Sequence, residues 1–187
     1  MRVAIFGGSF DPPHVAHVLA TEYVLSTGEV DSVLVLPVFD HAFGKPLAPF
    51  VHRVTMTRLA MAGKSGVEVS ALEESLGAPS RTLRTLEHLG AVHPDWVCRL
   101  VVGADVLTET AQWHRFEDVV RLAPLLVLGR VGVVREGAPA PVLPDVSSTE
   151  IRQRLATVSG RAAADAELQR LVPRAVLEYI DLHGLYR

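Results

Sequence analysis

Short apolar runs alternate along this chain with longer segments in which apolar residues recur at the spacing of a helix. The apolar runs predict strands at Val3–Phe6, Ser32–Pro37, Val67–Ser70, Val97–Val102 and Pro124–Leu128. The other segments predict helices at Val15–Ser26, Val51–Ala62, Arg81–Leu89, from Ser147 onward, and at Val172–His183. The glycine- and proline-bearing segments Asp40–Phe50 and Gly137–Pro144 predict loops.

Uninterrupted apolar strands separated by helices are typical of a parallel sheet that is covered on both faces. The sequence contains neither an internal repeat nor a linker long enough to divide the chain. We therefore predict a single α/β domain over residues 1–187, built as a doubly wound, mainly parallel, Rossmann-like sheet with a C-terminal helical segment. In such sheets, ligands bind beyond the carboxyl ends of the strands.

Composition narrows the classes of function. The 187 residues are 49% hydrophobic and 21% charged, which is typical of a globular protein. The net charge of −3 argues against general affinity for nucleic acid, and no apolar run approaches the ~18 residues of a membrane span. The lone Cys98 excludes an intramolecular disulfide and is predicted to be a small core residue. We expect a cytoplasmic protein with no nucleic-acid or membrane partner.

The first candidate site directly follows the first predicted strand. The chain there reads G-G-S-F-D-P-P-H from Gly7 to His14, and His17 follows three residues later. Glycines let a ligand approach the backbone, and Pro12 or Pro13 suits the first turn of a helix. His14 and His17 then share one helix face at its positive end. This arrangement predicts a binding site for a nucleoside triphosphate.

A second candidate site opens the helix that is predicted from Ser147. Ser147 and Glu150 have the spacing of a capping box, which by itself accounts for both residues. Ser148, Thr149 and Arg152 add two hydroxyls and a guanidinium at the same helix start. Such a group is suited to a second phosphate contact.

Other nucleotide and metal motifs are excluded. The first turn is not G-x-G-x-x-G, so the dinucleotide-binding fingerprint is absent. The segment Gly63–Ser65 resembles the end of a phosphate-binding P-loop, but Arg58 occupies the position of its first glycine. The histidines and Cys98 show no metal-ligand spacing, and we predict no protein-held metal site.

These motifs together resemble the nucleotidyltransferase superfamily of the H-x-G-H kind, and within it the bacterial nicotinate-nucleotide adenylyltransferases. The resemblance rests on G-G-S-F-D-P-P-H-x-x-H early and S-S-T-x-I-R late. It also includes G-A-D at Gly103–Asp105, the pair Gln112-Trp113, and the tail from Val172 to Tyr186. It covers nearly the whole chain, although Ala16 stands where the family often has glycine.

The resemblance implies adenylyl transfer from ATP, accompanied by Mg²⁺, to nicotinate mononucleotide in NAD biosynthesis. We predict that His14, His17 and Arg152 contact the triphosphate during catalysis. The predicted nucleotide-binding residues are Gly7, Gly8, Ser9, Phe10, Gly103, Asp105, Ser148 and Thr149. The predicted acceptor-binding residues are Lys45, Arg53, Thr82 and Trp113.

Two segments depart from the family pattern. The chain has His41–Lys45 where the family has P-P-H-K, and Arg81 and Arg84 replace the Tyr and Asp of S-Y-T-x-D-T-L. These arginines fit either a solvated helix face or a contact with substrate. Three alternatives therefore remain: transfer to nicotinamide mononucleotide, transfer to phosphopantetheine, and a nucleotide-binding regulator without catalysis. Whether the chain forms a homo-oligomer is also open.

Overall fold

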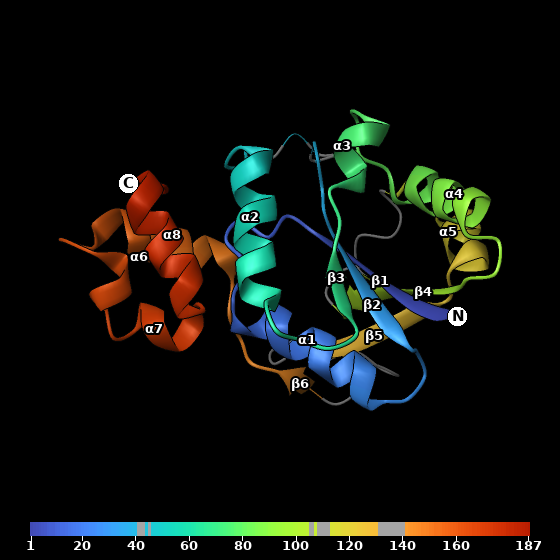
Figure 1. The fold of residues 1–187 in the computed structure, drawn as a ribbon, viewed down its shortest axis with the longest axis horizontal. Coiled ribbons are helices and arrows are strands. Elements are labelled where there is room, and N and C mark those ends of the chain that lie inside the picture. The colour runs from blue at the N-terminus through green and yellow to red at the C-terminus, as the bar shows by residue number, and fades with distance from the viewer. Residues whose placement is uncertain (41–43, 45, 105–106, 108–112, 131–140) are drawn as a thin grey trace.

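A computed structural model describes residues 1–40, 44, 46–104, 107, 113–130 and 141–187. Its centre is a sheet of six strands in the order β3-β2-β1-β4-β5-β6, in which every neighbouring pair is parallel (Figure 1). The strands are β1 (Arg2–Gly8), β2 (Ser32–Pro37), β3 (Val67–Val69), β4 (Val97–Gly103), β5 (Leu125–Arg130) and β6 (Pro141–Leu143). The chain order reverses between β1 and β4, which is the point where doubly wound sheets bind ligands. The predicted fold class is confirmed.

Helices cover both faces of this sheet. They are α1 (Val15–Ser26), α2 (Phe50–Met61), α3 (Leu72–Leu76), α4 (Thr82–Val92), α5 (Phe116–Leu122), α6 (Ser148–Thr157), the 3-10 helix η3 (Ala162–Ala164), α7 (Leu168–Leu171) and α8 (Arg174–His183). Helices α4 and α5 lie on one side of the strands, and α1 lies on the other (Figure 1). None of the described helices has the length and hydropathy that a membrane crossing requires.

Strand β1 is buried because its side chains point alternately into two cores. Val3 and Ile5 pack in one cluster with leucines of α4, including Leu86. Ala4 belongs to a second cluster, with Val24 of α1. Burial of apolar surface on both faces contributes about 25 cal/mol per Å², which explains why the strand is apolar from Val3 to Phe6.

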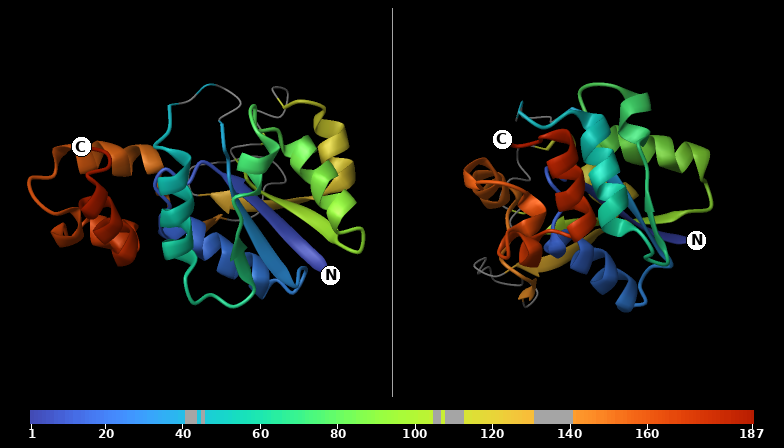
Figure 2. Two further views of the ribbon diagram at one scale, coloured as in Figure 1. Left: turned by 45° about the horizontal axis from the view of Figure 1, so that its top comes forward. Right: turned by 60° about the vertical axis from the view of Figure 1, so that its left-hand side comes forward.

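The C-terminal helices α6, α7 and α8 stand beside the sheet, as both views of Figure 2 show, and α8 packs against α2. Their apolar residues form a third cluster that includes Ile151 and Leu177. Ala16 of α1 and Met56 and Ala60 of α2 complete the same cluster. The C-terminal segment is therefore joined to the sheet through a shared core.

Several short elements were not predicted, and one helix boundary was wrong. The missed elements are strand β6, the helices α3, α5 and α7, and the 3-10 helix η3; β6 falls inside the expected loop Gly137–Pro144. Three to seven residues carry too little periodicity for recognition, so tertiary contacts determine these elements. Helix α8 begins only after Pro173.

Helix α1 begins at Val15 as predicted, but the expected proline in its first turn is wrong. The Asp11–Pro12 peptide bond is cis, and both prolines precede the helix, whose N-cap is His14. The backbone N–H of His14 donates to Nδ1 of His17 at 3.1 Å. The side chain of His17 thus satisfies an N–H at the N-terminus of the helix.

We predict that Asp181 holds the C-terminal segment together through its charge. Its carboxylate accepts hydrogen bonds from the N–H groups of Ala162 (2.7 Å) and Ala163 (2.9 Å), and from Arg187 (2.7 Å). Burial raises the pKa of Asp181, but the two amides and Arg187 together lower it below its usual value. A carboxyl with a lowered pKa stabilises the folded state above its unfolded pKa of about 4 and loses this effect as pH falls through the folded pKa.

Asp181→Asn should therefore lower the free energy of unfolding by about 2 kcal/mol at pH 7, and by less at pH 3. Urea denaturation at both pH values measures this difference. Glu178→Gln, which alters an exposed ion pair on the same helix, should change stability by no more than about 0.5 kcal/mol. If Asp181→Asn lowered the free energy of unfolding equally at both pH values, the effect would come from the packing of the side chain rather than from its charge.

Candidate active site

The two glycines that end β1 have different surroundings. A Cβ at Gly8 would lie 3.2 Å from the ring of Phe10, so a side chain there would force this buried ring to shift by a few tenths of an ångström. A Cβ at Gly7 would meet no atom within 4 Å, so internal packing does not require glycine there. Both residues line a cavity, and the open face at Gly7 leaves its backbone accessible to a ligand.

The side chain of Phe10 is buried next to Gly8. It is 1% exposed, has a positive φ of 47°, and packs against Phe6 and His17 with ring centroids 5.5 and 4.9 Å apart. The prediction that Phe10 binds nucleotide is not supported for its side chain, because the ring is enclosed in the core. The ring of Phe10 instead packs against the imidazole of His17.

The two histidines of the motif lie against each other. Their ring centroids are 3.8 Å apart, and the rings are inclined by 31°. Because Nδ1 of His17 accepts the N–H of His14, a neutral His17 carries its proton on Nε2 and presents an N–H donor there. This tautomer suits a contact with a phosphate oxygen.

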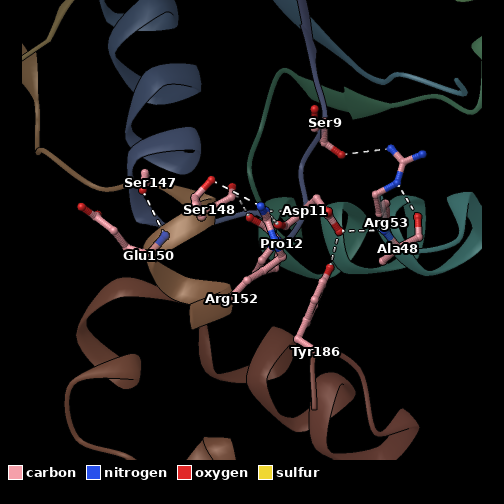
Figure 3. A network of polar contacts seen from close by, with 11 residues as sticks. Ser9, Asp11, Pro12, Ala48, Arg53, Ser147, Ser148, Glu150, Arg152 and Tyr186 are labelled. Atoms are coloured by element: carbon pink, nitrogen blue, oxygen red, sulfur yellow. Dashed lines mark hydrogen bonds and ion pairs between the residues drawn. The ribbon is translucent and has the colours of Figure 1, made fainter. Parts of the chain in front are cut away.

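The second motif lies directly against the first, although some 140 residues separate them (Figure 3). Ser147 caps α6 by accepting the N–H of Glu150, as predicted. The hydroxyl of Ser148 donates to the carbonyl of Pro12 at 2.9 Å. Arg152 donates from Nη1 to the carbonyl of Asp11 at 2.7 Å and from Nη2 to Oγ1 of Thr149 at 3.3 Å. The positive N-terminus of α6 therefore faces the loop that precedes α1.

Asp11 is the centre of this polar network. Its side chain is buried, and Oδ1 accepts hydrogen bonds from the hydroxyl of Tyr186 at 2.7 Å and from the N–H of Ala48 at 3.2 Å. Its Oδ2 lies 3.8 Å from Nη1 of Arg152. Sequence reasoning assigned Asp11 no role, although the residue stands inside the first motif.

Arg53 has a structural role in this network, which corrects its predicted contact with substrate. Its side chain is 1% exposed and donates to the carbonyls of Ala48 (2.8 Å), Ser9 (3.0 Å), Val38 (2.8 Å) and Phe39 (3.2 Å). Burial lowers the pKa of the guanidinium, while Asp11 opposes that shift. A guanidinium enclosed by carbonyls cannot also hold a phosphate.

A cavity of about 440 Å³ opens where the carboxyl ends of β1 and β4 meet the start of α4. Its volume lies in the range of small-molecule sites. Six of the predicted site residues line it: Gly7, Gly8, Ser9, Thr82, Gly103 and Trp113. The sheet therefore gathers one group of predicted residues around a cavity, and the C-terminal segment gathers another group around Asp11.

The cavity also contains residues that sequence reasoning missed. Glu73 of α3 is buried and accepts a hydrogen bond from the hydroxyl of Thr85, and both residues line the cavity. His114, which is exposed in a turn, lines it as well. A carboxylate on a five-residue helix leaves no recognisable pattern in the sequence.

The two unusual arginines have different environments. Arg84 donates to the carbonyl of Gly77, so it stabilises the turn before α4 rather than forming a solvated face. Arg81 is exposed and lines the cavity, where it can meet a ligand. The predicted site residues Lys45 and Asp105 lie outside the described part of the chain.

The sequence matches a protein family and individual proteins over most or all of its length. Residues 5–154 match the cytidylyltransferase-like family. A protein of Anaeromyxobacter dehalogenans (strain 2CP-1) named "Probable nicotinate-nucleotide adenylyltransferase" is 48% identical over 190 residues, which cover 100% of this chain and 97% of that protein. A protein of Thermus thermophilus with the same name is 37% identical, and both chains are covered in full.

A solved structure has the same fold. It is the nicotinic acid mononucleotide adenylyltransferase of Plasmodium falciparum complexed with NaAD, which aligns with a TM-score of 0.82 at 19% identity. The alignment covers 99% of this chain and 97% of that one.

We predict that replacing Arg53 affects folding before it affects chemistry. Arg53→Ala should lower the free energy of unfolding by about 3 kcal/mol, because buried carbonyls lose their charged donor. Urea denaturation measures this loss. Arg58→Ala changes an exposed arginine of the same helix and should stay within about 0.5 kcal/mol of the parent chain. If Arg53→Ala were equally stable but catalytically dead, the predicted substrate contact would be reinstated.

Proposed function

Because the chain belongs to the cytidylyltransferase-like family and is a nucleotidyltransferase, we propose that it transfers the adenylyl group of ATP to nicotinate mononucleotide in NAD biosynthesis. The products are nicotinate adenine dinucleotide and pyrophosphate. The observation that carries the proposal is the contact of Ser148 and Arg152 with the carbonyls of Pro12 and Asp11. That contact unites both phosphate-binding motifs at one loop.

The reaction needs no protein nucleophile. An oxygen of the mononucleotide's 5′-phosphate attacks the α-phosphorus of ATP, a P–O bond forms, and the bond to the β-phosphate breaks with release of pyrophosphate. The second pKa of a phosphate monoester is about 6, so the attacking group is mostly a dianion near pH 7. The enzyme has to align two anions and stabilise the charge of the leaving group.

The residues around the first loop supply what this chemistry requires. Two unit charges 4 Å apart repel by about 4 kcal/mol at an effective dielectric constant of 20, so positive charge must be provided. We assign that charge to Arg152, and we assign ring N–H donation to the same phosphates to His14 and His17. The N-termini of α1 and α6 add backbone N–H groups and partial positive charge. Gly7, Gly8, Ser9, Ser148 and Thr149 complete the proposed nucleotide contacts.

Mg²⁺ enters this proposal as part of the substrate, bound to ATP. Within the described residues, no three His, Cys, Asp or Glu side chains come together as a metal site. Both oxygens of Asp11 already face Tyr186, Ala48 and Arg152. Phosphate oxygens and water are therefore the ligands we assign to the cation.

The cavity between β1, β4 and α4 is the site that we assign to the mononucleotide acceptor. Trp113 offers a flat ring for stacking on the pyridine, and Thr82 offers a hydroxyl and the N-terminus of α4. We keep the assignment of Gly103 and Asp105 to the nucleotide and of Lys45 to the acceptor; Asp105 and Lys45 lie outside the described residues. Arg81 on the cavity wall favours the acid form of the pyridine, because a guanidinium binds a carboxylate better than an amide.

We further infer that residues 1–187 act as one domain, since α1 and α2 share a core with α6, α7 and α8. Unfolding transitions followed by tryptophan fluorescence and by circular dichroism should then coincide.

The acceptor assignment predicts a preference for the acid. Pyrophosphate release should be about tenfold more efficient, as kcat/KM, with nicotinate mononucleotide than with its amide, since about 1.4 kcal/mol of charge-assisted bonding gives a factor of ten. Phosphopantetheine at equal concentration should give no release. Arg81→Ala should lower the ratio of kcat/KM for nicotinate mononucleotide to kcat/KM for its amide. Binding of ATP without release for any acceptor would identify a regulator instead of an enzyme.

The catalytic assignment predicts a selective loss in kcat. His17→Ala should lower kcat by about 100-fold with a smaller change in KM, because the contact of His17 strengthens as charge develops on the leaving group. Steady-state kinetics of pyrophosphate release measures both constants. His183→Ala, at the exposed end of α8, serves as the control. Unchanged turnover in His17→Ala would remove His17 from the catalytic residues.

A further inference from the structure

The last residues of the chain reach back to the loop where the proposed nucleotide site begins. The hydroxyl of Tyr186 donates to Oδ1 of Asp11 at 2.7 Å, across 175 positions of sequence. Figure 3 shows this side chain rising from the C-terminal segment toward Asp11, next to Arg152. The ring of Tyr186 also packs against the core shared by α1, α2 and the C-terminal helices.

The backbone at Tyr186 is held in an unusual conformation. Its φ of 63° lies in the left-handed region, which residues other than glycine rarely adopt. Contacts on both sides fix it: the N–H of Leu185 donates to the carbonyl of Ile180 at 3.1 Å, and Arg187 donates to Asp181 at 2.7 Å. The chain end is therefore anchored where the phenol reaches Asp11.

The phenol affects how Asp11 and Arg152 interact. Arg152 donates to the backbone carbonyl of Asp11 at 2.7 Å, whereas the carboxylate Oδ2 lies 3.8 Å from the same nitrogen. Without the phenol, the described donors to Oδ1 would be reduced to the N–H of Ala48 at 3.2 Å. A buried carboxylate that loses a donor gains by approaching the nearest cation. Arg152 would then be drawn into a closer ion pair and away from a phosphate.

We propose that Tyr186 is a positioning residue of the nucleotide site, whose phenol holds the Asp11 carboxylate in place and so keeps Arg152 available to the triphosphate of ATP. This inference rests on the proposed adenylyl transfer. It makes docking of the C-terminal segment a condition for a complete site.

The test is Tyr186→Phe, which removes one oxygen. Tyr179→Phe is the matched control, since Tyr179 lies on α8 and its hydroxyl is 2.9 Å from Nδ1 of His52 instead of Asp11. Tyr186→Phe should lower kcat/KM for ATP about tenfold and leave KM for the mononucleotide unchanged. Tyr179→Phe should leave both constants unchanged. Melting temperatures of both variants separate a general loss of stability from this selective effect.

A double-variant experiment tests the route through Arg152. In an Arg152→Ala background, Tyr186→Phe should cause little further loss, because the group that it positions is already absent. The proposal is overturned if Tyr186→Phe matches Tyr179→Phe in kcat/KM for ATP, or if the tenfold loss persists in the Arg152→Ala background. Should Tyr186→Phe fail to fold, Tyr186→Leu, which also places no hydrogen-bond donor at Asp11, is held to the same expectations.

Failure of the proposed function gives a different result. If the parent chain releases no pyrophosphate with any acceptor, the adenylyl transfer is wrong. Calorimetric titration with ATP alone then decides the role of Tyr186. A dissociation constant about tenfold weaker in Tyr186→Phe supports the positioning role, and an unchanged constant refutes it.

Discussion

The arrangement of the proposed nucleotide site depends on one buried carboxylate, that of Asp11. A charge inside a protein has to be paired and hydrogen-bonded, because desolvation otherwise makes its burial unfavourable. The partners of Asp11 come from distant parts of the chain: Ala48 before α2, Arg152 on α6, and Tyr186 at the C-terminus. The hydrogen bonds to Oδ1 and the ion pair at Oδ2 form when these segments meet. Their meeting also brings the hydroxyls and the guanidinium of α6 to the loop that carries the histidine pair.

Two arginines flank this carboxylate and have opposite roles. Arg53 is enclosed, and its guanidinium is bonded to carbonyls of the loops after β1 and β2. The side chain of Arg152 is 24% exposed and donates to the carbonyl of Asp11, in the loop between β1 and α1. Exposure therefore separates an arginine that builds the loop from one that we assign to phosphate. Both residues have the same charge, so this distinction follows from position alone.

The acceptor side of the site depends on the sheet rather than on the C-terminal segment. Parallel strands β1 and β4 diverge at the reversal of chain order and leave a cavity above their carboxyl ends. Residues at the start of helix α4 line that cavity. The hydrogen bond from Thr85 to Glu73 connects α4 to α3. Catalysis by alignment requires the proposed sites for ATP and for the mononucleotide to adjoin each other. The end of β1 at Gly7 and Gly8 belongs to both proposed sites.

The sequence by itself determined the elements with strong local patterns and the residues with local chemistry. Strand β2 and helix α1 were predicted with their observed bounds, since Pro37 ends the apolar run of the strand, and Pro13 and Gly28 stand on either side of the helix. The two phosphate motifs were recognisable because glycines, histidines and hydroxyls stand close together in each. The tertiary structure alone decided that Arg53 is internal, that Asp11 binds Tyr186, and that Glu73 lies at the cavity. These outcomes depend on desolvation and pairing between residues far apart in the chain, and no local pattern records such contacts.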